Sequence, residues 1–237
     1  MNGQSQALVA LIILLFVTPA RPQQAAPSGD LDIAPGFKLR PSGGLDIGPI
    51  YAEIVHFDPD WTDTEQHDVY HPEKFPASTT QPGAITLTGK FPLKSDYFTL
   101  TERIVPADNG IDYSAIMSAD KNLITTNELS LAFSLPVATF GGKQITIDHQ
   151  PQDLPLAPAA KDGARLFEKE DANEIDLPIS GGTLVITGDF DILLQDDRQW
   201  GDQRYALRIH FTPGDGDIKQ STIDLKMKWK TAIPLSP

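Results

Sequence analysis

Hydrophobic and polar residues alternate along most of the chain after Ile50, which is the period of a β-strand with one buried face. The clearest case is 223–230, where Ile223, Leu225, Met227 and Trp229 share one face and every residue between them is charged. Runs rich in Val, Ile, Thr, Tyr and Phe, the residues that favour strands, cover 50–57, 84–91, 97–105, 111–117, 128–135, 143–147, 174–179, 183–187, 190–194, 205–211 and 218–229.

Turn-forming residues separate these runs. Ser-Gly-Gly at 180–182 and Pro-Gly-Asp-Gly-Asp at 213–217 each predict a hairpin between two strands. Helical periodicity is rare: 159–171 could form one short helix, which Gly163 weakens. The pattern predicts an all-β fold, an antiparallel β-sandwich of jelly-roll or supersandwich-like type with about eleven strands and little helix.

The first fifty residues differ from the rest. Eleven apolar residues at 7–17 are too few to span a bilayer and precede Thr-Pro-Ala at 18–20, although 1–6 contains no Lys or Arg. We therefore expect a cleaved signal peptide over 1–20, a secreted or periplasmic location and no membrane insertion after cleavage. The Pro- and Gly-rich segment 21–49 repeats SGDLDIAP as SGGLDIGP and is a linker or a duplicated lead-in to the first strands. Residues 50–237 are predicted to form a single sandwich domain.

Composition excludes several classes of function. The 237 residues carry 19 Lys and Arg against 32 Asp and Glu, a formal net charge of -13, so phosphates and anionic membranes would be repelled and we expect no nucleic-acid partner. The chain has no Cys, which excludes disulfides, thiol nucleophiles and iron–sulfur clusters. The sequence also contains no G-x-S-x-G or H-E-x-x-H motif, and we assign no catalytic residues.

The long segment 58–82 combines aromatic and acidic residues. Trp61 and Tyr70 lie among five carboxylates, and aromatic rings beside carboxylates are what a sugar-binding surface requires. The alternative is that Trp61 plugs the end of the sandwich. His67 and His71 are four residues apart, but a metal site needs three or four converging ligands, so we expect none. A structural Ca²⁺ ion has no support in the sequence, because Asp-Gly-Asp at 215–217 lacks the ligand spacing of an EF-hand, and no other cofactor is expected.

A second candidate site lies in 189–211, which is a strand, a polar loop and another strand. The loop and the next strand place Asp197, Arg198, Trp200 and Arg204 within eight residues. In strand geometry, positions 204, 206 and 208 form a polar stripe on one face, while the residues between them belong to the core. Guanidinium groups pair with carboxylates, which here are either sugar acids or the protein's own Asp196 and Asp197.

About half of the chain resembles a known module. The similar pieces are YFTLTERI at 97–104, TNELSL at 126–131, FGGK at 140–143, QDDRQWG at 195–201 and Leu-Arg at 207–208. They resemble the N-terminal β-sandwich, or supersandwich-like, module of large secreted bacterial proteins that degrade glycans. The resemblance implies a supersandwich-like fold and a neighbouring catalytic module. The chain is then either a free-standing module or part of a longer reading frame.

The leading hypothesis is a secreted, non-catalytic β-sandwich that binds a polysaccharide or oligosaccharide, or supports its degradation. Its expected ligand-binding residues are Trp61, Tyr70, Asp197, Arg198, Trp200 and Arg204. One alternative is a glycoside hydrolase or polysaccharide lyase with a carboxylate pair among Asp191, Asp196 and Asp197. Another is a structural or interaction protein of the cell envelope or matrix, in which both Trp61 and Trp200 would be buried.

Overall fold

The computed structural model describes residues 24–25, 29–65, 77–81, 83–93, 96–125, 127–160, 163–213 and 216–230. The predicted signal peptide 1–20, Tyr70, His67 and His71 lie outside the described residues. Within the described part of the chain, the structure contains no helix that is both long and apolar enough to cross a membrane.

The described residues are almost entirely strands, which confirms the predicted all-β class. The strands are β1 (Gln24–Ala25), β2 (Leu31–Ala34), β3 (Phe37–Leu39), β4 (Leu45–Ile47), β5 (Ile50–Phe57), β6 (Asp63–Glu65), β7 (Ala77–Gln81), β8 (Ala84–Pro92), β9 (Tyr97–Ala107), β10 (Gly110–Thr125), β11 (Glu128–Pro136), β12 (Gln144–Ile147), β13 (Gln150–Asp153), β14 (Arg165–Ile179), β15 (Gly182–Asp196), β16 (Arg204–His210) and β17 (Gly216–Trp229). Two one-turn helices, α2 (Val137–Phe140) and the 3-10 helix η2 (Asp197–Trp200), interrupt them.

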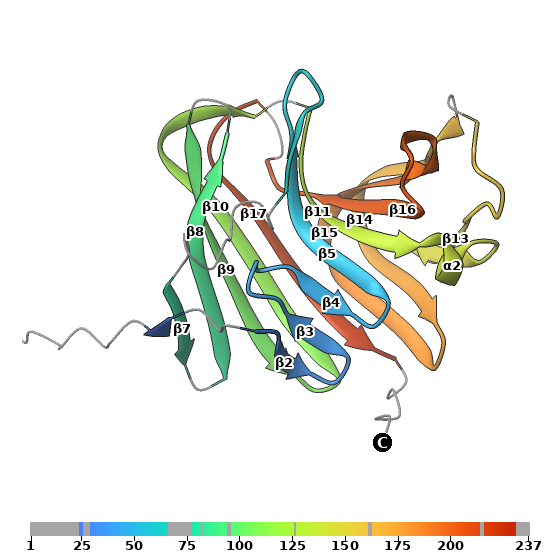
Figure 1. Ribbon diagram of the computed structural model, residues 1–237, viewed down its shortest axis with the longest axis horizontal. Coiled ribbons are helices and arrows are strands. Elements are labelled where there is room, and N and C mark those ends of the chain that lie inside the picture. Colours follow the sequence, from blue (N-terminus) through green and yellow to red (C-terminus); the bar gives the residue numbers. More distant parts are fainter. Residues whose placement is uncertain are drawn as a thin grey trace, which may run out of the picture.

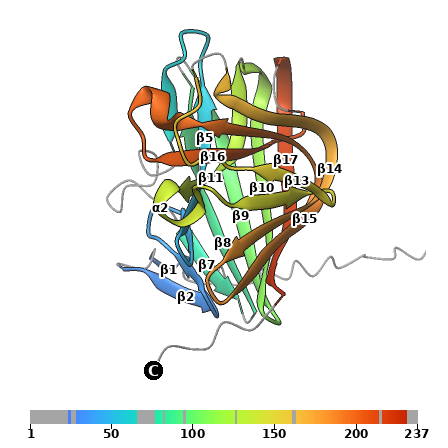
Figure 2. The ribbon, with the colours of Figure 1, turned by 90° about the vertical axis from the view of Figure 1, so that its right-hand side faces the viewer.

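Hydrogen bonds join the strands into one continuous antiparallel sheet that curls into two facing layers. One layer contains β8, β9, β10 and β17, and the other contains β5, β11 and β16 (Figure 1). The long strand β15 links them, because its first half pairs with β17 and its last residues pair with β16. Figure 2 shows β14, the partner of β15, bending from one layer toward the other.

The core fills the space between the layers, as the alternation predicts. On β17 the side chains of Ile223, Leu225, Met227 and Trp229 are buried, and the residues at 224, 226, 228 and 230 are exposed. The same rule holds for the even- and odd-numbered residues of β11, where 129, 131, 133 and 135 belong to the hydrophobic core. The opposite face of β11 is therefore free to form a polar surface outside the sandwich core.

Local predictions have mixed outcomes. The turn at 180–182 joins β14 to β15 as a hairpin, as predicted. The hairpin predicted around 213–217 is present only as a single antiparallel bridge between Thr212 and Thr222, because β16 itself pairs with β11 and β15, whereas β17 pairs with β10 and β15. The predicted helix at 159–171 is wrong. Its second half belongs to β14, where pairing with β15 satisfies the backbone.

The short sequence repeat before Ile50 produces two strands. The first copy supplies β2 and the second supplies β4, and both pair with β3, so that Lys38 lies between Asp32 and Asp46. Both strands contribute buried residues to the core, Ile33 from β2 and Leu45 and Ile47 from β4. The boundary at residue 49 between a lead-in segment and a separate domain stays a prediction.

Candidate functional site

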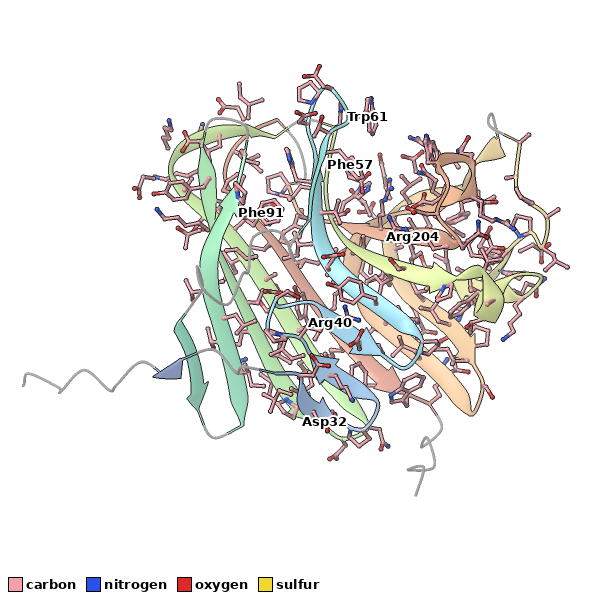
Figure 3. All side chains as sticks on the ribbon, viewed as in Figure 1. Asp32, Arg40, Phe57, Trp61, Phe91 and Arg204 are labelled. Carbon is pink, nitrogen blue, oxygen red and sulfur yellow. The ribbon has the colours of Figure 1, made fainter. Side chains whose placement is uncertain are left out.

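A cleft of about 510 Å³ lies where the tip of the β5–β6 hairpin faces η2 and the start of β16. Its walls combine aromatic and charged side chains: Phe57, Trp61, Gln195, Asp197, Trp200, Asp202, Arg204 and Arg208. Figure 3 shows Trp61 above Phe57 at the end of its hairpin, with Arg204 on the neighbouring part of the second layer. Four of the six predicted ligand-binding residues, Trp61, Asp197, Trp200 and Arg204, therefore meet in one place.

The turn after β5 presents Trp61 to solvent. The Asp58 carboxylate accepts hydrogen bonds from the backbone N–H groups of Asp60 (2.8 Å) and Thr62 (2.9 Å), an arrangement for which Asp is well suited. Trp61 itself has a φ of 59°, in the left-handed region that non-glycine residues seldom adopt. The residue is 63% exposed, and its ring lies beside that of Phe57, with ring centroids 6.1 Å apart. Trp61 is thus not the buried plug that the alternative reading expected.

The helix η2 presents Trp200 in a similar way. Asp196 precedes the helix and accepts from the Arg198 N–H at 3.2 Å, which caps its first turn. Gly201 ends it with a φ of 102°, a conformation that glycine adopts without strain. The turn leaves the Trp200 side chain 60% exposed. Two indole rings that a folded protein would ordinarily bury are instead held open on the same cleft.

Two arginines form the charged part of the cleft. Arg204 is bound through Nε to Asp197 Oδ2 (3.2 Å), through Nη2 to Asp202 Oδ2 (3.0 Å) and through Nη1 to the Ser134 hydroxyl (3.2 Å). Gln195 donates to the other oxygen of Asp197 at 3.0 Å. The predicted pairing of this polar stripe with the protein's own carboxylates is therefore present, with Asp197 and Asp202 as the partners.

Arg208 lies deeper in the same stripe. Its Nη1 is 3.1 Å from Glu128 Oε2, and Ser130 donates to the other oxygen of Glu128 at 2.7 Å. Its guanidinium carbon lies 4.9 Å from the centroid of the Phe57 ring. The burial of both Arg208 and Glu128 fixes this end of the cleft in one arrangement.

Arg198 does not line the cleft, which corrects the prediction that it orients a ligand. Its side chain is 4% exposed and points inward, where it binds both oxygens of Asp196 at 2.8 and 2.7 Å. It also donates to the carbonyl oxygens of Pro155, Leu156 and Ala157 at 2.7, 2.7 and 3.1 Å. The one-turn helix breaks the strand alternation, so Arg198 and Arg204 face opposite sides.

Four cleft residues, Phe57, Gln195, Asp202 and Arg208, were not among the predicted ligand-binding residues, although the sequence already placed Arg208 on the polar stripe. The sequence contained a signal for two of them. Strand alternation places Arg208 on the same face of β16 as Arg204, and it places Phe57 on the same face of β5 as Glu53 and Val55. The structure confirms this, since these residues share a shallow hollow on the outer face of the second layer with Ala132 and Ser134 of β11. The cleft thus continues onto a polar sheet face.

The three carboxylates considered for catalysis do not line a common cavity. Asp191 lines a different cavity with Asp171, Asp189 and Asp224, Asp196 is buried against Arg198, and only Asp197 lines the cleft. Burial by itself would raise the pKa of Asp196, but hydrogen bonds from Arg198 and from the Ala159 N–H outweigh it, so its pKa lies below the usual value. A general acid needs the opposite shift.

Metal binding finds no support in the part of the chain that the structure describes. None of its His, Asp and Glu side chains gather in groups of three or more that could hold an ion. His56, the histidine nearest to the segment 58–82 in the sequence, faces the core side of β5 at the end of the strand, where it is buried. The cleft is therefore a surface of aromatic rings, guanidinium groups and carboxylates.

Comparisons with known proteins leave the family open. No family model matches the chain, and no curated protein matches it. Among solved structures, the chain is similar to a putative aldose 1-epimerase from Escherichia coli K12, with 10% sequence identity and a TM-score of 0.47, over 86% of this chain and 98% of that chain. The function of the cleft therefore has to be inferred from its own side chains.

Proposed function

We propose that the cleft binds carbohydrate, and that the chain is a secreted, non-catalytic β-sandwich that binds a polysaccharide or supports its degradation. One observation carries the proposal: Trp61 and Trp200 line the same cleft and are 63% and 60% exposed. Exposed aromatic rings beside fixed polar groups suit a pyranose, because the ring stacks on the apolar C–H face of the sugar while carboxylates and amides bind its hydroxyl groups.

The geometry of the polar residues supports the same ligand. Asp197, Gln195 and Arg204 are held by one another, so they present donors and acceptors at defined positions without a rearrangement on binding. Asp202 is half-exposed and offers its carboxylate to hydroxyl groups at the rim. The exposure of both tryptophans also argues against the purely structural alternative, which required them to be buried.

A glycan screen with the full chain tests the proposal. The chain has three tryptophans, and Trp229 is buried, so a change in tryptophan emission on binding reports on Trp61 and Trp200. We expect at least one polysaccharide to bind and to shift the emission. Absence of binding to every glycan, with unchanged emission, would overturn the proposal.

Single substitutions locate the binding surface. Trp200→Ala and Trp61→Ala should each weaken binding at least about tenfold, because aromatic anchors carry much of the energy of such contacts. Tyr97→Ala is the matched control, since Tyr97 is another exposed aromatic and does not line the cleft. If both tryptophan variants bind like the wild-type protein, the cleft is not the binding site.

Export of the protein is also a proposal, supported by the apolar run at 7–17 and the small residues that follow it. Sequencing the N-terminus of the protein recovered outside the cytoplasm tests it. We expect a chain that begins near Arg21, and recovery of a chain that still begins at Met1 would contradict signal cleavage.

A further inference from the structure

The charges around the cleft are already paired within the protein. All three guanidinium nitrogens of Arg204 are engaged, with Asp197, Asp202 and Ser134. Arg208 is engaged by Glu128 at 3.1 Å, and its other terminal nitrogen lies 3.9 Å from Asp197. The arginines that would ordinarily recognise an acidic sugar therefore already hold carboxylates.

The balance of these charges is negative. Three carboxylates, from Asp197, Asp202 and Glu128, surround two guanidinium groups, so this cluster carries one net negative charge. The chain as a whole, with this cluster included, carries a formal net charge of -13. A carboxylate or sulfate on a bound sugar would meet repulsion from this cluster, and partial burial of the cluster reduces screening by salt.

Displacing an internal carboxylate would not relieve this repulsion. Asp197 is buried, and an acidic sugar that took its place on Arg204 would leave the Asp197 carboxylate buried with a hydrogen bond from Gln195 and with Arg208 3.9 Å away. A buried carboxylate that loses its hydrogen-bonded arginine is destabilised. A hydroxyl group, which can donate to Asp202 without breaking an ion pair, carries no such penalty.

We infer that the cleft selects uncharged glycans and discriminates against those with carboxylate or sulfate groups on the sugar units that contact Trp61 and Trp200. This inference rests on the proposed carbohydrate-binding function and specifies its ligand class. The paired arginines are then specificity determinants that organise the carboxylates around the sugar rather than receptors for an anionic ligand.

Matched polymer pairs test the inference. Each pair shares a backbone and differs in charge: dextran and dextran sulfate, hydroxyethyl cellulose and carboxymethyl cellulose, and methyl-esterified and de-esterified polygalacturonate. In every pair of which either member binds, we expect the uncharged member to bind at least about tenfold more tightly. An equal or higher affinity for the charged member would overturn the inference and leave the proposed function standing. If no glycan binds at all, the proposed function itself is wrong.

The variant Asp202→Asn isolates the electrostatic cause. It removes one negative charge from the cleft and retains an oxygen that can accept from Arg204, so the preference for the uncharged member should fall at least about threefold. Asp32→Asn is the charge-matched control, because Asp32 is largely exposed and lies at the opposite end of the molecule from Trp61 (Figure 3). A preference that is the same in Asp202→Asn as in the wild-type protein would overturn the inference.

Discussion

Substituting Arg198 tests whether this residue stabilises the fold, as its buried contacts indicate, or binds the ligand. The variant Arg198→Met keeps the apolar stem and removes the guanidinium group. It eliminates the bonds to both oxygens of Asp196 and to the carbonyl groups of Pro155, Leu156 and Ala157. Asp196, whose side chain is 1% exposed, would keep only backbone donors such as the Ala159 N–H.

The expected cost is large. Removing one partner of a buried ion pair typically costs about 3–5 kcal/mol. For a chain of this size, each kcal/mol lowers the melting temperature by about 2–4 °C, so the melting temperature of Arg198→Met should fall by about 6–20 °C. Urea denaturation followed by circular dichroism measures the free energy of unfolding directly.

The pH dependence supplies an independent check. The folded state holds the pKa of Asp196 below its usual value, so this carboxylate stabilises the protein above its unfolded pKa of about 4, and the stabilisation is lost as the pH falls through the folded pKa. The stability difference between wild type and Arg198→Met should therefore shrink below about pH 4. The folded variant should still bind glycan. A variant as stable as the wild type, or one that loses binding at unchanged stability, would refute this role for Arg198.

Two further substitutions test the fold. Gly110→Ala should destabilise the protein by about 1–3 kcal/mol, because the added Cβ would lie 2.0 Å from the Met227 carbonyl oxygen of the paired strand. Gly163→Ala is the control, since its added Cβ would meet nothing within 4 Å. Equal urea midpoints for the two variants would contradict the β10–β17 register. Burial lowers the pKa of His56, against the opposing effect of Asp58 and Glu128. The folded protein therefore disfavours the protonated form, and stability should fall as the pH drops below about 6.5. Thermal melts at about pH 8 and pH 5.5 should show a smaller loss in His56→Gln than in the wild type, whereas identical losses would contradict this role.

Strand periodicity accounts for most of what the sequence could predict. Alternation identified the buried face of β17 and the polar stripe of Arg204 and Arg208 on β16, because a strand with one buried face repeats every two residues. The 213–217 turn shows the limit of local signals. Its residues predict a reversal of the chain, but they do not show which strand β17 pairs with. Both edges of β16 are already occupied, one by β11 and the other by β15, so β17 pairs elsewhere.

The candidate site was likewise predictable only where its residues are close in sequence. Asp197, Trp200 and Arg204 are close in sequence and could be recognised together as a candidate. Their meeting with Trp61 depends on β11, which lies between β5 and β16 and brings the β5–β6 hairpin to η2. The direction of Arg198 was not predictable either, since a 3-10 turn capped by Asp196 replaces the strand alternation there.

A crystal structure of the full chain with a bound neutral oligosaccharide tests the central claim most directly. We predict a pyranose ring stacked on the indole of Trp61 or Trp200, with a sugar hydroxyl within hydrogen-bond distance of Asp202 or Gln195. A sugar bound away from this cleft, for example in the cavity between Arg103 and Lys226, would contradict the account.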